Sequence, residues 1–123
     1  MEHNNLPEEL KGRTPTLRTV PMPADANVDG DIFGGWILSQ MDLAAGLRAN
    51  EYTRGRVVTV GIDAMSFHKP VFIGDEVGFY TEIVKVGRTS VTIKVESWSR
   101  RRANWDEHLK VTEGIFTFVA VDR

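Results

Sequence analysis

The 123-residue sequence contains no cysteine, which excludes disulfide bonds, thiolate catalysis and cysteine-ligated zinc. Its three histidines, His3, His68 and His108, are scattered along the chain and make a poor set of metal ligands. Basic residues are not in excess either, because 15 Lys and Arg stand against 17 Asp and Glu, for a net charge of −2. Proteins that neutralise phosphate backbones need such an excess, so we expect neither a nucleic-acid partner nor a metal.

Long apolar runs are also missing from the sequence. No stretch approaches the roughly 20 apolar residues of a membrane span. Residues 1–13 are rich in Glu and lack the apolar segment of a secretory signal, so they predict a flexible N-terminal tail. Residues 14–123 then form a single domain, for which 41% hydrophobic residues supply a core. We therefore expect a one-domain cytoplasmic protein without a membrane contact.

Local patterns predict one helix and five strands. Residues 14–22 indicate a short edge strand that ends at its prolines. Residues 36–47 are rich in Leu, Met, Gln and Ala and are apolar on nearly every side, which is typical of a buried helix. The rest of the chain alternates between apolar and polar residues, which predicts strands. Their expected ranges are 56–68, 76–86, 90–100 and 108–121, with a tight hairpin at 87–89 and a polar turn at 101–107.

This order of elements predicts an α+β fold in which the four long strands form an antiparallel meander. One flat face of a small sheet cannot cover a helix that is apolar all round. The sheet is therefore expected to wrap around the helix, and a second copy of the chain to cover the side that remains. The expected architecture is a five-stranded antiparallel sheet around one long central helix, paired as a dimer.

Asp42 is the single charged residue between Ile32 and Leu47, in the middle of the predicted helix. An unpartnered carboxylate in apolar surroundings costs several kcal/mol, so this residue requires an explanation. It is either a structural residue that bonds to a strand hydroxyl or a backbone amide, or a general base or nucleophile held in a dry cleft. The pattern alone leaves both interpretations open.

Gly34 and Gly35 stand where the helix is predicted to begin. Free amides and the positive end of the helix dipole suit an oxygen that gains negative charge, although a glycine pair also forms ordinary tight turns. Asp42 lies seven residues after Gly35, about 10 Å along the helix axis, so one helix does not bring both to the same carbonyl. Two helices packed around a two-fold axis would instead create two composite sites per dimer. Asn27 either orients a water or carbonyl there, or belongs to a turn.

Residues 27–42, NVDGDIFGGWILSQMD, resemble the signature of hotdog-fold acyl-CoA thioesterases of the YciA type. The resemblance extends over nearly everything from Thr14 onward. Its further blocks are residues 56–60, 66–71, 74–75, 86–90 and 116–122. It implies a hotdog fold that hydrolyses acyl-CoA thioesters to free CoA and a carboxylic acid. Coenzyme A is then part of substrate and product, and no separate cofactor is implied.

The resemblance also implies roles for individual residues. Asp42 matches the catalytic acid, as general base or nucleophile, and Gly34 and Gly35 match the glycines that begin the central helix. Asn27 matches an Asn that faces this Asp across the subunit interface. The resemblance further implies a hexamer of three dimers arranged in a ring.

Two segments are expected to bind the CoA end of the substrate, because Lys and Arg pair with phosphate oxygens, and hydroxyls and turn amides complete such contacts. They are His68, Lys69 and Pro70 after one strand, and Gly87, Arg88, Thr89 and Ser90 at the hairpin. His68 is given no catalytic role. The arginine triplet at 100–102 is interpreted as a solvated loop.

Two other functions are considered beside hydrolysis. A hotdog hydratase or dehydratase needs a His that acts together with a carboxylate, whereas this helix carries Asp without His. A non-catalytic acyl-CoA or nucleotide-binding module would be better served by Asn or an apolar residue than by Asp42. The residues therefore favour the hydrolase.

Overall fold

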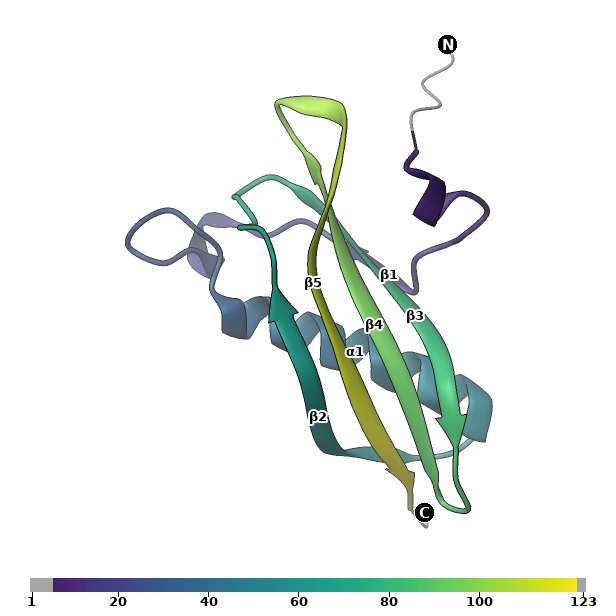
Figure 1. The fold of residues 1–123 in the computed structure, drawn as a ribbon. Coiled ribbons are helices and arrows are strands. Elements are labelled where there is room, and N and C mark those ends of the chain that lie inside the picture. Colours follow the sequence, from purple (N-terminus) through teal and green to yellow (C-terminus); the bar gives the residue numbers. More distant parts are fainter. Residues whose placement is uncertain (1–5, 122–123) are drawn as a thin grey trace.

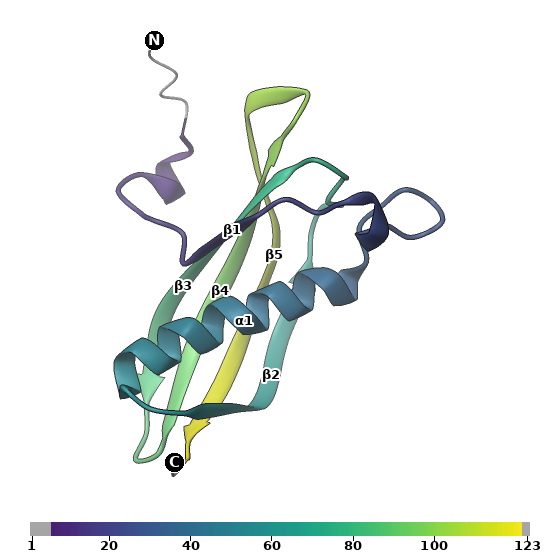
Figure 2. The ribbon, with the colours of Figure 1, turned by 180° about the vertical axis from the view of Figure 1, so that it is seen from behind.

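One long helix lies diagonally across one face of a five-stranded antiparallel sheet (Figure 2). The computed structural model describes residues 6–121. Its elements are η1 (Glu8–Leu10), β1 (Leu17–Thr19), η2 (Pro23–Asp25), α1 (Gly34–Thr53), β2 (Val57–Phe67), β3 (Glu76–Val86), β4 (Ser90–Arg101) and β5 (Asn104–Ala120). The predicted α+β architecture is confirmed.

The strand order is β1-β3-β4-β5-β2, and every neighbouring pair is antiparallel (Figure 1). Three of the four long strands, β3 to β5, form the predicted meander. The prediction was wrong for β2, which pairs with β5 at the far edge of the sheet and not with β3. The connection from β2 to β3 therefore passes across the ends of β5 and β4. It is held to the segment before the helix, where the Ile32 N–H donates to the Val71 carbonyl at 3.0 Å.

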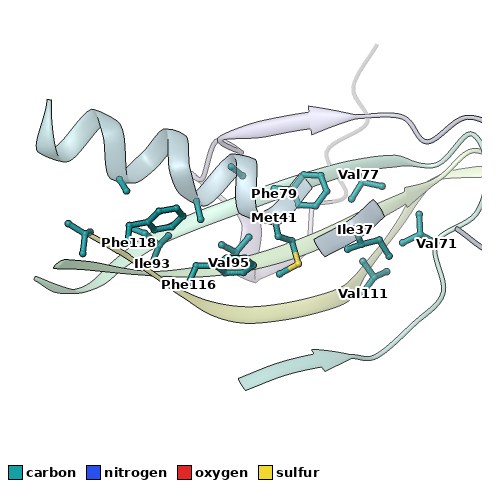
Figure 3. Close-up of a cluster of buried hydrophobic side chains, with 14 of the residues drawn as sticks. Ile37, Met41, Val71, Val77, Phe79, Ile93, Val95, Val111, Phe116 and Phe118 are labelled. Atoms are coloured by element: carbon teal, nitrogen blue, oxygen red, sulfur yellow. The ribbon is translucent and has the colours of Figure 1, made fainter. Parts of the chain in front are cut away.

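The core lies between α1 and the inner face of the sheet (Figure 3). The helix buries Ile37, Met41 and three alanines against aromatic and branched side chains of β3, β4 and β5. Alanines on this face let the helix approach the sheet closely. On its other side, Leu43 and Leu47 stay 51% and 48% exposed. A single chain therefore leaves part of the apolar helix surface uncovered.

Strand β2 contains a bulge that places one methionine on the inner face of the sheet. Its register against β5 shifts between Asp63 and Ser66, and Ala64 has a φ of 52°, which is uncommon for a residue with a Cβ. The neighbouring Met65 lies over Gly114 of β5, where a Cβ would overlap the Met65 sulfur. Gly114 is therefore the residue that leaves room for the Met65 side chain.

The turn between β4 and β5 is shorter than predicted. Arg101 pairs with Asn104, so the polar residues assigned to a turn at 101–107 mostly belong to β5. This hairpin is stabilised from its flank, because Arg100 lies 4.6 Å over the Trp105 ring and donates from Nε to the Trp105 carbonyl at 2.8 Å. Polar composition predicted a loop here because it does not reveal such cross-strand contacts.

The helix is longer than predicted at both ends, and the first strand is shorter. The helix ends at a left-handed Arg54, whose N–H donates to the Asn50 carbonyl at 2.8 Å. Part of the expected flexible tail is also structured. Leu10 is 1% exposed, and Arg13 lies over the Tyr80 ring and pairs with Glu96. Residues 1–5 of that tail lie outside the described residues.

Candidate active site

Helix α1 begins with two exposed glycines and without a capping side chain. The preceding Phe33 is the N-cap residue, and its carbonyl accepts hydrogen bonds from Trp36 and Ile37 at 3.0 and 3.3 Å. The amides of Gly34 and Gly35 therefore stand at the open end of the helix, where the dipole is positive. They can donate to an oxygen that carries negative charge.

A groove of about 400 Å³ borders this helix start. Its walls are the helix start with Gly34 and Ile37, the loop before it with Asn27 and Asp31, and residues 67–71, which comprise the last residue of β2 and the segment after it. The structure thus brings together five predicted site residues: Asn27, Gly34, His68, Lys69 and Pro70. Phe67 lies close to the helix start, since its ring is 3.6 Å from where a Cβ on Gly34 would be.

Asn27 has the turn role that its sequence context suggests. Its Oδ1 accepts hydrogen bonds from the N–H groups of Asp29 and Asp31 at 2.9 and 3.2 Å. This geometry fixes the loop before the helix and commits the side-chain oxygen. A further role towards a substrate would therefore fall to the Nδ2 group, which is a hydrogen-bond donor.

The His68 ring is held by a carboxylate on β5. Its Nε2 lies 2.9 Å from Glu113 Oε2, and this hydrogen bond is the main reason that the pKa of Glu113 is below its usual value. Lys110, whose Nζ is 3.3 Å from the same carboxylate, adds to the effect. His68 therefore borders the groove with one ring nitrogen already engaged.

Asp42 is half-buried and borders a second pocket, of about 390 Å³. The Thr59 hydroxyl of β2 donates to Asp42 Oδ1 at 2.7 Å. This is the structural contact that the sequence left open, but it engages only one carboxylate oxygen. Asn50, Arg56 and Phe118 line the same pocket. Thr59 was not predicted, because nothing in its sequence context marks it among the hydroxyl residues of the strands.

The groove and the Asp42 pocket are separate within one chain. They share no lining residue, and Asp42 lies seven positions after Gly35, about 10 Å along the helix axis. The predicted composite arrangement is thus compatible with the fold, since each chain presents two unlike halves. A single chain does not bring the halves together.

The two predicted CoA-binding segments are also far apart in one chain. Phe67 pairs with Thr112 of β5, whereas Ser90 pairs with Val119, seven residues along the same strand and about 23 Å away. In Figure 1 the turn between β3 and β4 accordingly lies near the C-terminus, at the opposite end of the sheet from the end of β2. In that turn the Gly87 N–H donates to the Ser90 carbonyl at 2.8 Å, and Arg88 and Thr89 are exposed.

Arg101 fixes the segment that follows β2, and this role was missed. Its guanidinium pairs with Asp75 Oδ2, donates to the Pro70 carbonyl at 3.1 Å and lies 4.5 Å over the Phe72 ring. Asp75 is 2% exposed, and its Oδ2 also accepts the Phe72 N–H at 3.0 Å. The interpretation of residues 100–102 as a solvated loop was therefore wrong for Arg101. Composition did not reveal it, because the partner lies 26 residues away.

The described residues 6–121 contain neither a candidate metal site nor a candidate membrane-spanning helix. No group of three or more His, Cys, Asp and Glu side chains in this part of the chain is placed to hold a metal ion. No helix within it is long and apolar enough to cross a membrane.

Comparison with known proteins identifies the family. The sequence model of the thioesterase superfamily matches residues 29–104, more than half of the chain. The chain belongs to the thioesterase superfamily. It is 48% identical over 108 residues to the acyl-CoA thioester hydrolase YciA of Escherichia coli, a match that covers 86% of this chain and 82% of that protein.

Two solved structures of this superfamily are similar in fold and sequence. The hexameric thioesterase of Yersinia pestis has a TM-score of 0.86 and 47% identity, over 92% of this chain and 91% of that one. A hexameric hotdog-fold thioesterase of Campylobacter jejuni has a TM-score of 0.85 and 44% identity, over 91% and 85%. These matches confirm the predicted resemblance to YciA-type hotdog-fold thioesterases.

Proposed function

We propose that this protein hydrolyses acyl-CoA thioesters to free CoA and a carboxylic acid. The observation that carries the proposal is the pair of unlike half-sites on one helix. The helix start presents open amides to a groove, and Asp42 presents a carboxylate to a separate pocket. The similarity to YciA of Escherichia coli, which is named for this activity, supports the same conclusion.

The chemistry follows from the groups in the two halves. The thioester carbonyl oxygen gains negative charge as the carbonyl carbon becomes tetrahedral, and the amides of Gly34 and Gly35 donate hydrogen bonds to it. Asp42 either removes a proton from the attacking water or attacks the carbon itself, which gives an anhydride that water then cleaves. The C–S bond breaks, and CoA leaves as a thiolate that needs no strong general acid. Asn27 lies at the groove to orient the water or the carbonyl through its Nδ2 group.

Such a site needs two copies of the chain. The surface that would join them is apolar: Leu43 and Leu47 are exposed on α1, and Val60 is 58% exposed on β2. A two-fold axis that pairs these surfaces places the helix start of one copy opposite Asp42 of the other and creates two sites per dimer. Because the similar thioesterases of known structure are hexameric, we further propose an assembly of three such dimers.

The direct test is thiol release from acetyl-, butyryl-, decanoyl- and palmitoyl-CoA by the purified wild-type protein. We expect hydrolysis of at least one of these esters, with CoA and the free acid formed in equal amounts. Binding of the esters without any thiol release would overturn the proposal and indicate a non-catalytic acyl-CoA-binding module. Formation of a hydrated acyl-CoA from an unsaturated ester would instead indicate a hydratase.

Arg88→Ala tests the proposed contact with the CoA phosphates. We expect KM for acyl-CoA to rise roughly fivefold to tenfold while kcat stays nearly constant, because a phosphate contact remote from the carbonyl stabilises the bound substrate and the transition state equally. Lys85→Ala, which removes an exposed cation from the same hairpin, is the matched control. An equal loss with a small thioester that lacks the nucleotide would contradict a phosphate role for Arg88.

A further inference from the structure

We propose that Met65 determines which acyl-chain lengths this protein accepts, as a flexible side chain that occupies the acyl pocket. The inference rests on the proposed function, since it assigns the pocket for the acyl part of that substrate. It is built on the bulge in β2, the missing side chain at Gly114 and the position of Phe67 at the groove.

The direction of the acyl chain follows from the surroundings of the helix start. A thioester carbonyl that binds the Gly34 and Gly35 amides lies in the groove beside α1. Much of the groove's rim is polar, with Asn27, Asp31 and Lys69, which suits the CoA end. Phe67 lines the groove beside the helix start, and two residues earlier in β2 Met65 packs on the core. We infer that the acyl chain leaves the groove past Phe67 and runs along β2. An apolar chain therefore meets Met65.

The inner face of the sheet near Met65 carries small residues. Gly114 has no side chain, and on the same face of the adjacent row Ser97 of β4 pairs with Thr112 of β5. Ser97 and Thr112 are fully buried, and their hydroxyls have no hydrogen-bond partner within the described part of the chain. Elsewhere this face carries large side chains such as Phe116 and Phe118. Above Gly114 the nearest atoms are those of the Met65 side chain, with the Phe116 ring beside them, so a movement of Met65 would open space there.

The backbone beside Met65 has two features that are frequent at functional sites. Ala64 adopts a left-handed conformation that is unfavourable for a residue with a Cβ, and such outliers cluster at functional sites. Bulges near active sites redirect a side chain, which is what this one does to Met65. Methionine suits a movable element, because it is unbranched, has three rotatable side-chain bonds and fits irregular spaces.

The test compares kcat/KM for decanoyl-CoA and butyryl-CoA in two variants. Met65→Ala removes the side chain over Gly114, and we expect the decanoyl-to-butyryl ratio to rise roughly tenfold, in line with the discrimination that one apolar pocket contact provides. Met65→Leu keeps a similar volume but is branched at Cγ and moves aside less easily, so we expect the ratio to fall. Met22→Ala, at a methionine that is 58% exposed, is the control and should leave the ratio unchanged.

A ratio within about twofold of wild type in both folded Met65 variants would overturn the inference while leaving the proposed function intact. Circular dichroism shows whether each variant is folded. If Met65→Ala does not fold, Met65→Leu decides alone by the same ratio. A wild-type protein that hydrolyses none of the esters would overturn the proposed function and this inference with it.

Discussion

Asp42→Asn is expected to lower kcat for acyl-CoA hydrolysis by roughly 10³-fold, because it removes the group that activates water or attacks the carbonyl. The substitution preserves the shape of the side chain, and the amide oxygen still accepts the Thr59 hydrogen bond. The free energy of unfolding should therefore change little. Stopped or continuous thiol-release assays at saturating acyl-CoA measure kcat, and circular dichroism checks the fold.

Two comparisons sharpen this expectation. Thr59→Val removes the hydroxyl that holds Asp42 Oδ1 and should cost roughly tenfold, far less than loss of the carboxylate itself, since it disturbs only the orientation of the base. An Asp42→Asn protein with near wild-type kcat would show that the carboxylate is structural. The chemistry proposed here would then need another residue as base.

Mixing of two inactive variants tests whether the site is shared between copies. Gly35→Pro removes one amide donor in the first turn of the helix, where proline is tolerated, and should lower kcat by roughly 10²-fold. In a dimer of one Gly35→Pro chain and one Asp42→Asn chain, one of the two composite sites keeps both intact halves. Random co-assembly should therefore restore about one quarter of wild-type activity. A mixture as inactive as its components would place both halves within one chain.

Arg101→Ala is expected to lower the free energy of unfolding by about 3–5 kcal/mol, because it leaves the buried Asp75 carboxylate without its charged partner. The variant also loses the hydrogen bond to Pro70 and the contact with Phe72. Urea denaturation at one fixed protein concentration measures the effect, since assembly contributes to the apparent stability. Because Pro70 belongs to a predicted CoA-binding segment, KM should rise as well.

Two further variants distinguish the effect of losing this buried ion pair from the effect of losing a positive charge in general. Arg102→Ala removes a neighbouring exposed arginine and should change the free energy of unfolding by no more than about 0.5 kcal/mol. An Asp75→Ala/Arg101→Ala double variant removes both charges and should be more stable than Arg101→Ala alone. A loss below about 1 kcal/mol in the single variant would contradict the role assigned to Arg101.

Much of the fold could be predicted from periodicity. The limits predicted for β3 are those observed, and β4 differs by one residue. β4 alternates in burial over most of its length because one face packs on α1, which is the pattern that a sequence displays directly. In β3 the apolar residues Val77, Phe79 and Ile83 recur at even spacing, although burial does not alternate strictly. The position of β2 in the sheet was mispredicted because alternation does not show which strands are neighbours. Alternation shows which residues face the core, whereas the neighbour of a strand depends on where the connection after it runs.

The sequence predicted some residues of the candidate site and missed others. The sequence pointed to Asp42, Gly34 and Gly35, because a lone charge and a glycine pair are conspicuous in an apolar helix. It did not point to Thr59 or Arg101, whose partners Asp42 and Asp75 lie 17 and 26 residues away in the chain. Their residue types are ordinary for exposed strands and loops, so only the folded chain distinguishes them.

The two edge strands of the sheet differ in length, which favours one of them for pairing with a second chain. β1, at one edge, has three residues, and β2, at the other, has eleven. A long free edge offers backbone groups to another chain, whereas a very short one is a poor template. On the other side, β1 covers only residues 77–79 of β3, so the remainder of β3 is not paired with β1. The eleven-residue edge of β2 is therefore the longest continuous backbone template that the described part of the sheet offers to a second copy.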